Sequence, residues 1–160
     1  MKVAICPGSF DPVTLGHLDI IERASGLFDK VVVAVLCNMD KKPSFSVEER
    51  ISFLKETTAH LHNVEIDSFD GLLMDFAREK SAVAVVKGLR AVSDFEYEFQ
   101  MSMINKKLCP EVETVYLNTS QEYMYLSSSV VKQIASFGGD IRNFVPEAIH
   151  SKIVDRLTNM

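Results

Sequence analysis

Short apolar runs rich in β-branched residues alternate along the chain with stretches in which apolar residues recur at helical spacing. Five runs predict buried strands: Val3 to Cys6, Val31 to Cys37, Val64 to Ile66, Val83 to Val86 and Val115 to Leu117. The intervening stretches predict crossover helices, the first of which carries Leu18, Ile21, Ala24 and Phe28. This alternation predicts a doubly wound α/β fold, a five-stranded parallel sheet with helices on both faces.

Two helix starts carry a capping-box pattern, Ser46 followed by Glu49 and Ser93 followed by Glu96. Helical spacing is also present in two further sets: Val47, Ile51, Leu54 and Leu61, then Leu72, Phe76 and Glu79. Beyond the fifth strand we expect C-terminal helices, at residues 129–137 before Gly138-Gly139 and at a last segment with Ile149, Ile153 and Leu157. No repeat or linker interrupts the pattern, so residues 1–160 are expected to form a single domain.

Composition narrows the classes of protein and of partner. The chain has 160 residues, 47% of them hydrophobic, so it can bury a core without a metal or a disulfide. Three cysteines without C-x-x-C spacing predict reduced thiols and a cytoplasmic location. The net charge of −5 disfavours nucleic acid as a partner. Its longest apolar run, residues 31–37, is too short to span a membrane, and the N-terminus lacks the apolar core of a signal peptide.

The loop after the first strand holds the first candidate site. In doubly wound sheets ligands bind beyond the carboxyl ends of the strands, so the loops after Cys6, Cys37, Val86 and Leu117 are expected to line one crevice. The first loop has no Walker or G-x-G-x-x-G motif, but it contains two glycines and ends with His17 in a first helical turn, where a phosphate is favoured. Alternatively the glycines only shape a turn and His17 is a capping or surface residue. The coincidence of strand, glycine loop and histidine favours function.

Three separated motifs carry a family resemblance. Gly8-Ser9-Phe10-Asp11-Pro12 with Thr14-Leu15-Gly16-His17 resembles the [H/T]-x-G-H signature of the nucleotidyltransferase superfamily. Together with residues 88–98 and 127–129, the chain closely resembles bacterial phosphopantetheine adenylyltransferases over nearly its whole length.

The resemblance implies a Rossmann-like nucleotidyltransferase fold and an enzyme that transfers AMP from ATP to 4'-phosphopantetheine, giving dephospho-coenzyme A and pyrophosphate. It also implies Mg²⁺ carried with ATP rather than held by a protein metal site, and a homohexamer. It leaves open whether coenzyme A is a feedback ligand.

The same resemblance assigns residues to this chemistry. Catalytic roles fall to His17, Lys41 and Arg90. The positions implied in ATP binding are Ser9, Phe10, His17, Gly88, Leu89, Arg90, Glu98, Tyr123, Met124, Tyr125, Leu126, Ser127, Ser128 and Ser129. Those implied in binding the acceptor are Ser9, Lys41, Leu73 and Lys87. The chain departs from the family pattern at Lys87, where arginine is usual, and at Tyr123, where tryptophan is frequent.

The residue types themselves suit phosphate binding. The guanidinium fork of Arg90 fits two phosphate oxygens, and Lys41 and Lys87 add point charges, although a lysine here could also be a solvated surface cation. The three serines Ser127, Ser128 and Ser129 place hydroxyls at a helix start, and one of them is expected to serve only as an N-cap.

Two alternatives to this enzyme remain, another small nucleotidyltransferase and a non-catalytic nucleotide-binding module. Three cations around one phosphate favour an enzyme over the passive module. The helix from Asp94 to Leu108 has apolar residues on more than one face, which predicts either burial by another subunit or burial within its own core.

Overall fold

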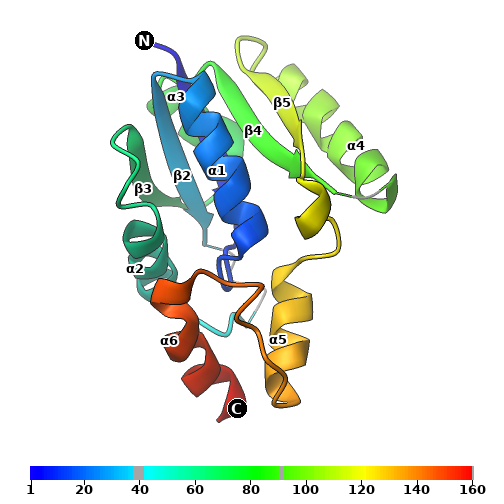
Figure 1. Cartoon of the computed structure of the whole chain (residues 1–160). Coiled ribbons are helices and arrows are strands. Elements are labelled where there is room, and N and C mark those ends of the chain that lie inside the picture. The colour runs from blue at the N-terminus through cyan, green and yellow to red at the C-terminus, as the bar shows by residue number, and fades with distance from the viewer. Residues whose placement is uncertain (38–41, 91, 160) are drawn as a thin grey trace.

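A single parallel sheet forms the centre of the molecule (Figure 1). The computed structural model describes residues 1–37, 42–90 and 92–159, with residues 92–94 described by their backbone alone. The strands of this part are β1 (Val3–Gly8), β2 (Lys30–Leu36), β3 (Val64–Phe69), β4 (Ala84–Leu89) and β5 (Glu113–Asn118). They pair in parallel in the order β3-β2-β1-β4-β5. This order confirms the predicted five-stranded doubly wound sheet.

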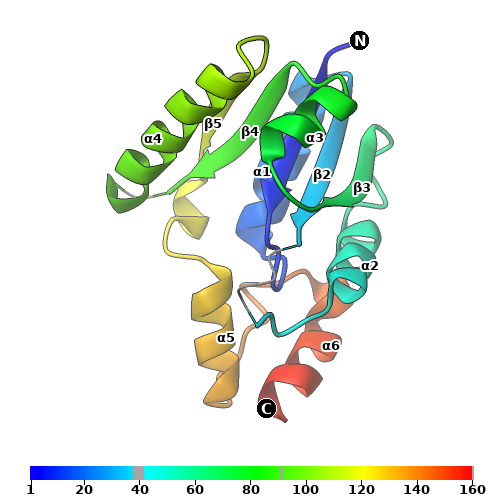
Figure 2. The same ribbon diagram turned by 180° about the vertical axis from the view of Figure 1, so that it is seen from behind.

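Helices cover both faces of the sheet (Figures 1 and 2). They are α1 (Leu15–Leu27), α2 (Val47–Thr57), α3 (Leu73–Glu79), α4 (Val92–Leu108), α5 (Ser128–Ser136) and α6 (Glu147–Thr158), with a short 3₁₀ turn η1 (Gln121–Tyr123). Figure 2 shows α3 and α4 on the face opposite α1. No helix among the described residues is long and apolar enough to cross a bilayer.

Strand β2 explains why the sheet is buried on both sides. Val31, Val33 and Val35 pack into the core cluster shared with α1, α2, α5 and α6, whereas Val32 and Ala34 pack into the cluster shared with α3. Because successive side chains of a strand point to opposite faces, a continuous apolar run is what a strand covered on both faces requires.

Several element boundaries differ from those predicted. Strand β1 continues through Gly8, because Pro7 and Gly8 remain in register with Ala34 and Val35 of β2. The capping box at Ser93 is wrong, since α4 begins at Val92 and Ser93 lies inside it.

Helix α2 also ends earlier than its apolar spacing suggested. It stops at Thr57, where the hydroxyls of Thr57 and Thr58 bond to carbonyls of the last turn. Leu61 therefore packs on the core from outside the helix.

Helix α4 exposes much of its apolar surface. Tyr97 and Met103 are 64% and 60% exposed, and Phe95, Phe99, Ile104 and Leu108 are also exposed. Phe95 and Phe99 stack on each other with ring centroids 5.8 Å apart. The interpretation that α4 is buried within its own core is therefore wrong.

The capping box of α2 gives a test of local stability. The Ser46 hydroxyl accepts a hydrogen bond from the Glu49 N–H, and the Glu49 carboxylate accepts one from the Ser46 N–H. We expect Ser46→Ala to lower the free energy of unfolding by about 1 kcal/mol. Ser52→Ala makes the same chemical change at an exposed position of the same helix, where stability should hold or rise by about 0.5 kcal/mol. Urea denaturation compares the two, and equal losses would contradict the capping role.

Candidate functional site

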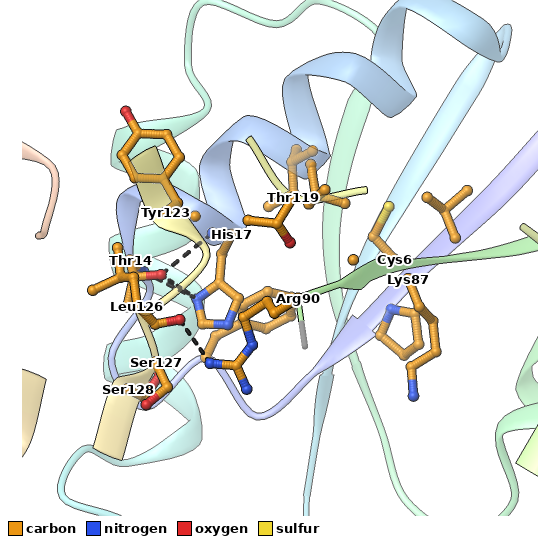
Figure 3. A pocket seen from close by; sticks show the side chains of 17 residues that line it. Cys6, Thr14, His17, Lys87, Arg90, Thr119, Tyr123, Leu126, Ser127 and Ser128 are labelled. Atoms are coloured by element: carbon orange, nitrogen blue, oxygen red, sulfur yellow. Dashed lines mark hydrogen bonds between the residues drawn. The ribbon is translucent and has the colours of Figure 1, made fainter. Parts of the chain in front are cut away.

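A cavity of about 280 Å³ opens where the strand order reverses, at the carboxyl ends of β1 and β4 (Figure 3). It is closed by the first turns of α1 and α5 and by the segment after β5. The lining residues are Cys6, Pro7, Phe10, Thr14, Gly16, His17, Ile20, Ile21, Val86, Lys87, Gly88, Arg90, Thr119, Tyr123, Leu126, Ser127 and Ser128. Three of the four predicted loops meet here. Cys37, at the end of β2, does not line the cavity, and residues 38–41 lie outside the described part of the chain.

His17 is held in one orientation by Thr14, the N-cap of α1. The Thr14 hydroxyl oxygen accepts a hydrogen bond from the His17 N–H at 3.3 Å, and the Thr14 N–H donates to His17 Nδ1 at 3.0 Å. The Thr14 hydroxyl also lies 3.1 Å from Nδ1. Because Nδ1 accepts a backbone proton, this network assigns the proton of the neutral ring to Nε2. Nε2 is therefore a hydrogen-bond donor on the side of the ring turned away from Thr14.

The surroundings keep this imidazole neutral. Burial and, to a smaller extent, the positive charge of Arg90 together lower the pKa of His17 to about 4. The edge of the ring also packs against Phe10, with centroids 5.1 Å apart. At neutral pH His17 is therefore suited to donate a hydrogen bond from Nε2 without carrying a charge.

Two cations line the cavity at the end of β4, Lys87 within the strand and Arg90 directly after it. Arg90 donates from Nη1 to the Leu126 carbonyl oxygen at 2.7 Å, which links the end of β4 to the segment before α5. Lys87 Nζ lies 2.9 and 2.8 Å from the two carboxylate oxygens of Glu98 on α4. The Tyr116 hydroxyl donates to the Glu98 carbonyl at 2.6 Å and so fixes the backbone at that position. Glu98 does not line the cavity; it pairs with a cation that does.

The three serines at the start of α5 make different contacts. Ser127 is the N-cap, and its hydroxyl accepts from the Val130 N–H at 3.2 Å, as expected for one of the three. The Ser128 hydroxyl donates to the Pro12 carbonyl at 2.7 Å, while Ser129 is exposed and does not line the cavity. Tyr123 and Leu126 line the cavity, whereas Met124 and Tyr125 are exposed outside it.

The remaining predicted residues are scattered. Phe10 and Gly88 line the cavity. Ser9 is exposed beside it, Leu89 is the last residue of β4, and Leu73 packs on the core cluster beneath α3. Lys41 lies outside the described residues. Their binding roles stay predictions.

Gly88 is at a point of close approach between β4 and α1. A Cβ atom there would lie 3.0 Å from Ile20 Cγ1, so the Ile20 side chain on α1 would have to give way by a few tenths of an ångström. A glycine at this position lets the first helix pack closely on β4 at the edge of the cavity.

Sequence reasoning missed several lining residues, chiefly Cys6, Thr14 and Thr119. Thr14 had a usable signal, because a threonine three residues before a polar side chain at a helix start is the capping-box spacing. Cys6 had none, since burial depends on the whole fold. Burial raises the pKa of the Cys6 thiol to about 12, so it stays protonated and is not a nucleophile.

Together these groups can bind a chain of phosphates. Arg90 and Lys87 supply positive charge, His17 supplies a neutral donor, and the N-terminal turns of α1 and α5 add backbone N–H groups and the positive ends of two helix dipoles. Donors that are held in place before a ligand arrives can also stabilise charge that develops on a phosphoryl group during a reaction.

The neutral state of His17 predicts a dependence of stability on pH. The unfolded chain, whose histidine has a pKa of 6.5, binds a proton that the folded chain takes up only near pH 4, so stability falls as the pH drops through this window. His17→Gln keeps an acceptor for the Thr14 N–H but does not titrate. When the pH is lowered from about 7 to about 5, the free energy of unfolding of His17→Gln should fall by about 1 to 2 kcal/mol less than that of the parent protein. Urea denaturation at both pH values measures this, and parallel losses of stability in the two proteins would contradict a neutral His17 imidazole in the folded state.

Known proteins are similar to this chain in sequence and in fold. Residues 5–134 match the cytidylyltransferase-like family. The phosphopantetheine adenylyltransferase of Caldanaerobacter subterraneus subsp. tengcongensis is 58% identical over 98% of each chain, and that of Clostridium perfringens is 54% identical over 100% of this chain and 98% of its own.

A solved structure adds evidence on the fold alone. The bifunctional NMN adenylyltransferase/ADP ribose pyrophosphatase of Francisella tularensis has a TM-score of 0.75 at 14% identity, with 99% of this chain and 50% of that chain covered. Both the sequence motifs and the sheet therefore agree with the relatives, and the chain belongs to the phosphopantetheine adenylyltransferase family.

Proposed function

We propose that this protein transfers AMP from ATP to 4'-phosphopantetheine, releasing pyrophosphate and forming dephospho-coenzyme A in coenzyme A biosynthesis. The observation that carries the proposal is the His17 imidazole, which Thr14 holds with Nε2–H as its donor in the same cavity as Arg90. Relatives that are named for this activity, at 58% and 54% identity, support the choice of substrates.

The reaction needs positioning and charge stabilisation more than proton removal. A phosphate monoester has its second pKa near about 6, so the attacking oxygen of the acceptor is already anionic at neutral pH. That oxygen attacks the α-phosphorus of ATP as the bond to the bridging oxygen breaks and pyrophosphate leaves. His17 Nε2–H and the Arg90 guanidinium would donate to the α-phosphoryl oxygens as their charge changes. A general base is not part of this scheme.

Different cations are proposed to bind the two substrates. Lys87, and Lys41 outside the described residues, would bind the acceptor phosphate, while Arg90 and the first turn of α5 would bind ATP. ATP would enter as its magnesium complex, and the ion would neutralise part of the triphosphate charge. No group of three or more His, Cys, Asp or Glu in the described part of the chain could hold a metal ion, so the proposal treats Mg²⁺ as part of the substrate.

Pyrophosphate release tests the proposed function against its alternatives. ATP or CTP is incubated with 4'-phosphopantetheine or with nicotinamide mononucleotide, and pyrophosphate is measured. We expect release only with ATP and 4'-phosphopantetheine. Release with another pair would assign the protein to a sister activity, and binding of ATP without release under any pair would indicate a non-catalytic module.

Removing the His17 side chain separates catalysis from capping. His17→Ala should lower kcat by about 10² to 10³, the usual cost of removing one preorganised donor, with a smaller change in ATP affinity. It should also lower stability by about 0.5 to 2 kcal/mol, because the ring takes part in the cap of α1. Single-turnover rates and melting are measured on the same preparation.

His60→Ala is the matched control for this change. His60 is half exposed and pairs with Glu22 at 2.9 Å, and it does not line the cavity. Its removal should leave turnover unchanged. Loss of stability in His17→Ala with unaltered turnover per folded molecule would refute the catalytic role.

The exposed apolar surface of α4 supports assembly into a homo-oligomer, for which we propose the hexamer that the family resemblance implies. Cytoplasmic location stays a prediction from cysteine usage. Light scattering at micromolar concentration should give a multiple of the 17.9 kDa chain mass, and Tyr97→Glu with Met103→Glu should dissociate the assembly. A monomer in the unaltered protein would contradict the prediction.

A further inference from the structure

A buried carboxylate outside the cavity lining joins three separate segments. Asp11 lies in the loop between β1 and α1 and is 7% exposed. Its Oδ1 accepts from the Phe45 N–H at 2.9 Å, and its Oδ2 accepts from the Ser44 N–H at 3.0 Å. Lys132 of α5 places Nζ 3.0 Å from the same Oδ2. One side chain therefore connects the His17 loop with the segment before α2 and with α5.

Further contacts hold the same loop at its two ends. Arg50 of α2 is 4% exposed and donates from Nη1 to the Ser9 carbonyl at 2.8 Å. On the other side, the Ser128 hydroxyl donates to the Pro12 carbonyl at 2.7 Å. The loop that leads to Thr14 and His17 is thus fixed by α2 and α5, which follow it by 41 and 116 residues in the sequence.

The ion pair of Asp11 and Lys132 is one of the contacts of this network that reach helix α5 from the loop. The Lys132 side chain is 32% exposed and that of Asp11 is 9% exposed, and the Asp11 carboxylate keeps two backbone N–H donors if the lysine charge is removed. Lys132 lies about one helical turn after Ser127 and Ser128, which line the cavity. The ion pair therefore ties α5, about one turn beyond its start, to the loop that presents His17.

We propose that Asp11 and Lys132 are positioning residues, which set the placement of the first turn of α5 relative to the first turn of α1. The two turns face the phosphates of ATP from different sides, so their separation decides whether the α-phosphoryl group meets His17 and Arg90 in line with the acceptor. This inference rests on the proposed function. Alignment affects the transition state more than the binding of ATP, because ATP keeps most of its contacts when one side of the cavity shifts.

Lys132→Met tests the proposal because it removes the charge and keeps the aliphatic part of the side chain. We expect kcat for AMP transfer to fall about tenfold, with the KM for ATP changed by less than about twofold. Lys132→Arg restores a cation and should recover most of kcat. Lys152→Met is the control for the same chemical change, since Lys152 of α6 forms an exposed ion pair with Glu56 at 2.6 Å, away from the cavity. It should leave both constants unchanged.

A double-mutant cycle identifies the partner. Asp11→Asn should also lower kcat, and adding Lys132→Met to it should cause little further loss if the two side chains act as one pair. If the fold losses in kcat of the two single variants multiply in the double variant, the two side chains act independently and the pairing is overturned. A fall in kcat that matches only the unfolded fraction, measured by melting, would assign Lys132 a purely structural role and overturn the proposal.

Hydrogen exchange gives a readout that does not depend on activity. Amides of residues 9–17 should exchange about tenfold faster in Lys132→Met than in Lys152→Met, because the loop has lost one of its anchors. Unchanged exchange there would overturn the positioning role even in an active enzyme. Absence of AMP transfer in the unaltered protein, with faster loop exchange in Lys132→Met, would instead refute the proposed function and retain the anchor.

Discussion

One reciprocal pair of hydrogen bonds at the start of α1 determines where the candidate chemistry lies. The Thr14 hydroxyl accepts from the His17 backbone, and His17 Nδ1 accepts from the Thr14 backbone. The first bond satisfies an amide that the helix leaves without a partner, and the second fixes the ring and its tautomer. A local requirement of helix formation therefore also aims the Nε2 proton.

The sheet places this helix start opposite the cations. Strand order reverses between β1 and β4, so the segments that follow these two strands lead away on opposite faces and leave a cavity between them. Gly88 allows α1 to pack closely on β4, with Ile20 3.0 Å from where a Cβ would lie. Arg90 then reaches across the cavity to the Leu126 carbonyl. The His17 and Arg90 positions are thus two consequences of one topology.

The cavity is lined by positive charge although the chain as a whole is negatively charged. The chain carries a net charge of −5, yet the cavity is lined by Lys87 and Arg90 and by a histidine that burial keeps neutral. Glu98 offsets one of these cations from outside the lining. A neutral donor next to Arg90 adds a hydrogen bond for a phosphate without adding a further positive charge that would repel Arg90, which is why a lowered pKa suits this position.

The sequence by itself determined the parallel sheet, the helix starts at residues 14–17 and 46–49, and the motif around His17, because periodicity and capping act between residues a few positions apart. Only the tertiary structure decided that Glu98 pairs with Lys87, that Leu73 packs against the core and that α4 leaves an apolar face exposed. It also decided that Ser128 bonds to Pro12, a residue 116 positions earlier. Such contacts depend on how whole helices and strands pack. A pattern of side chains a few residues long does not specify which residues a hundred positions away will lie beside it.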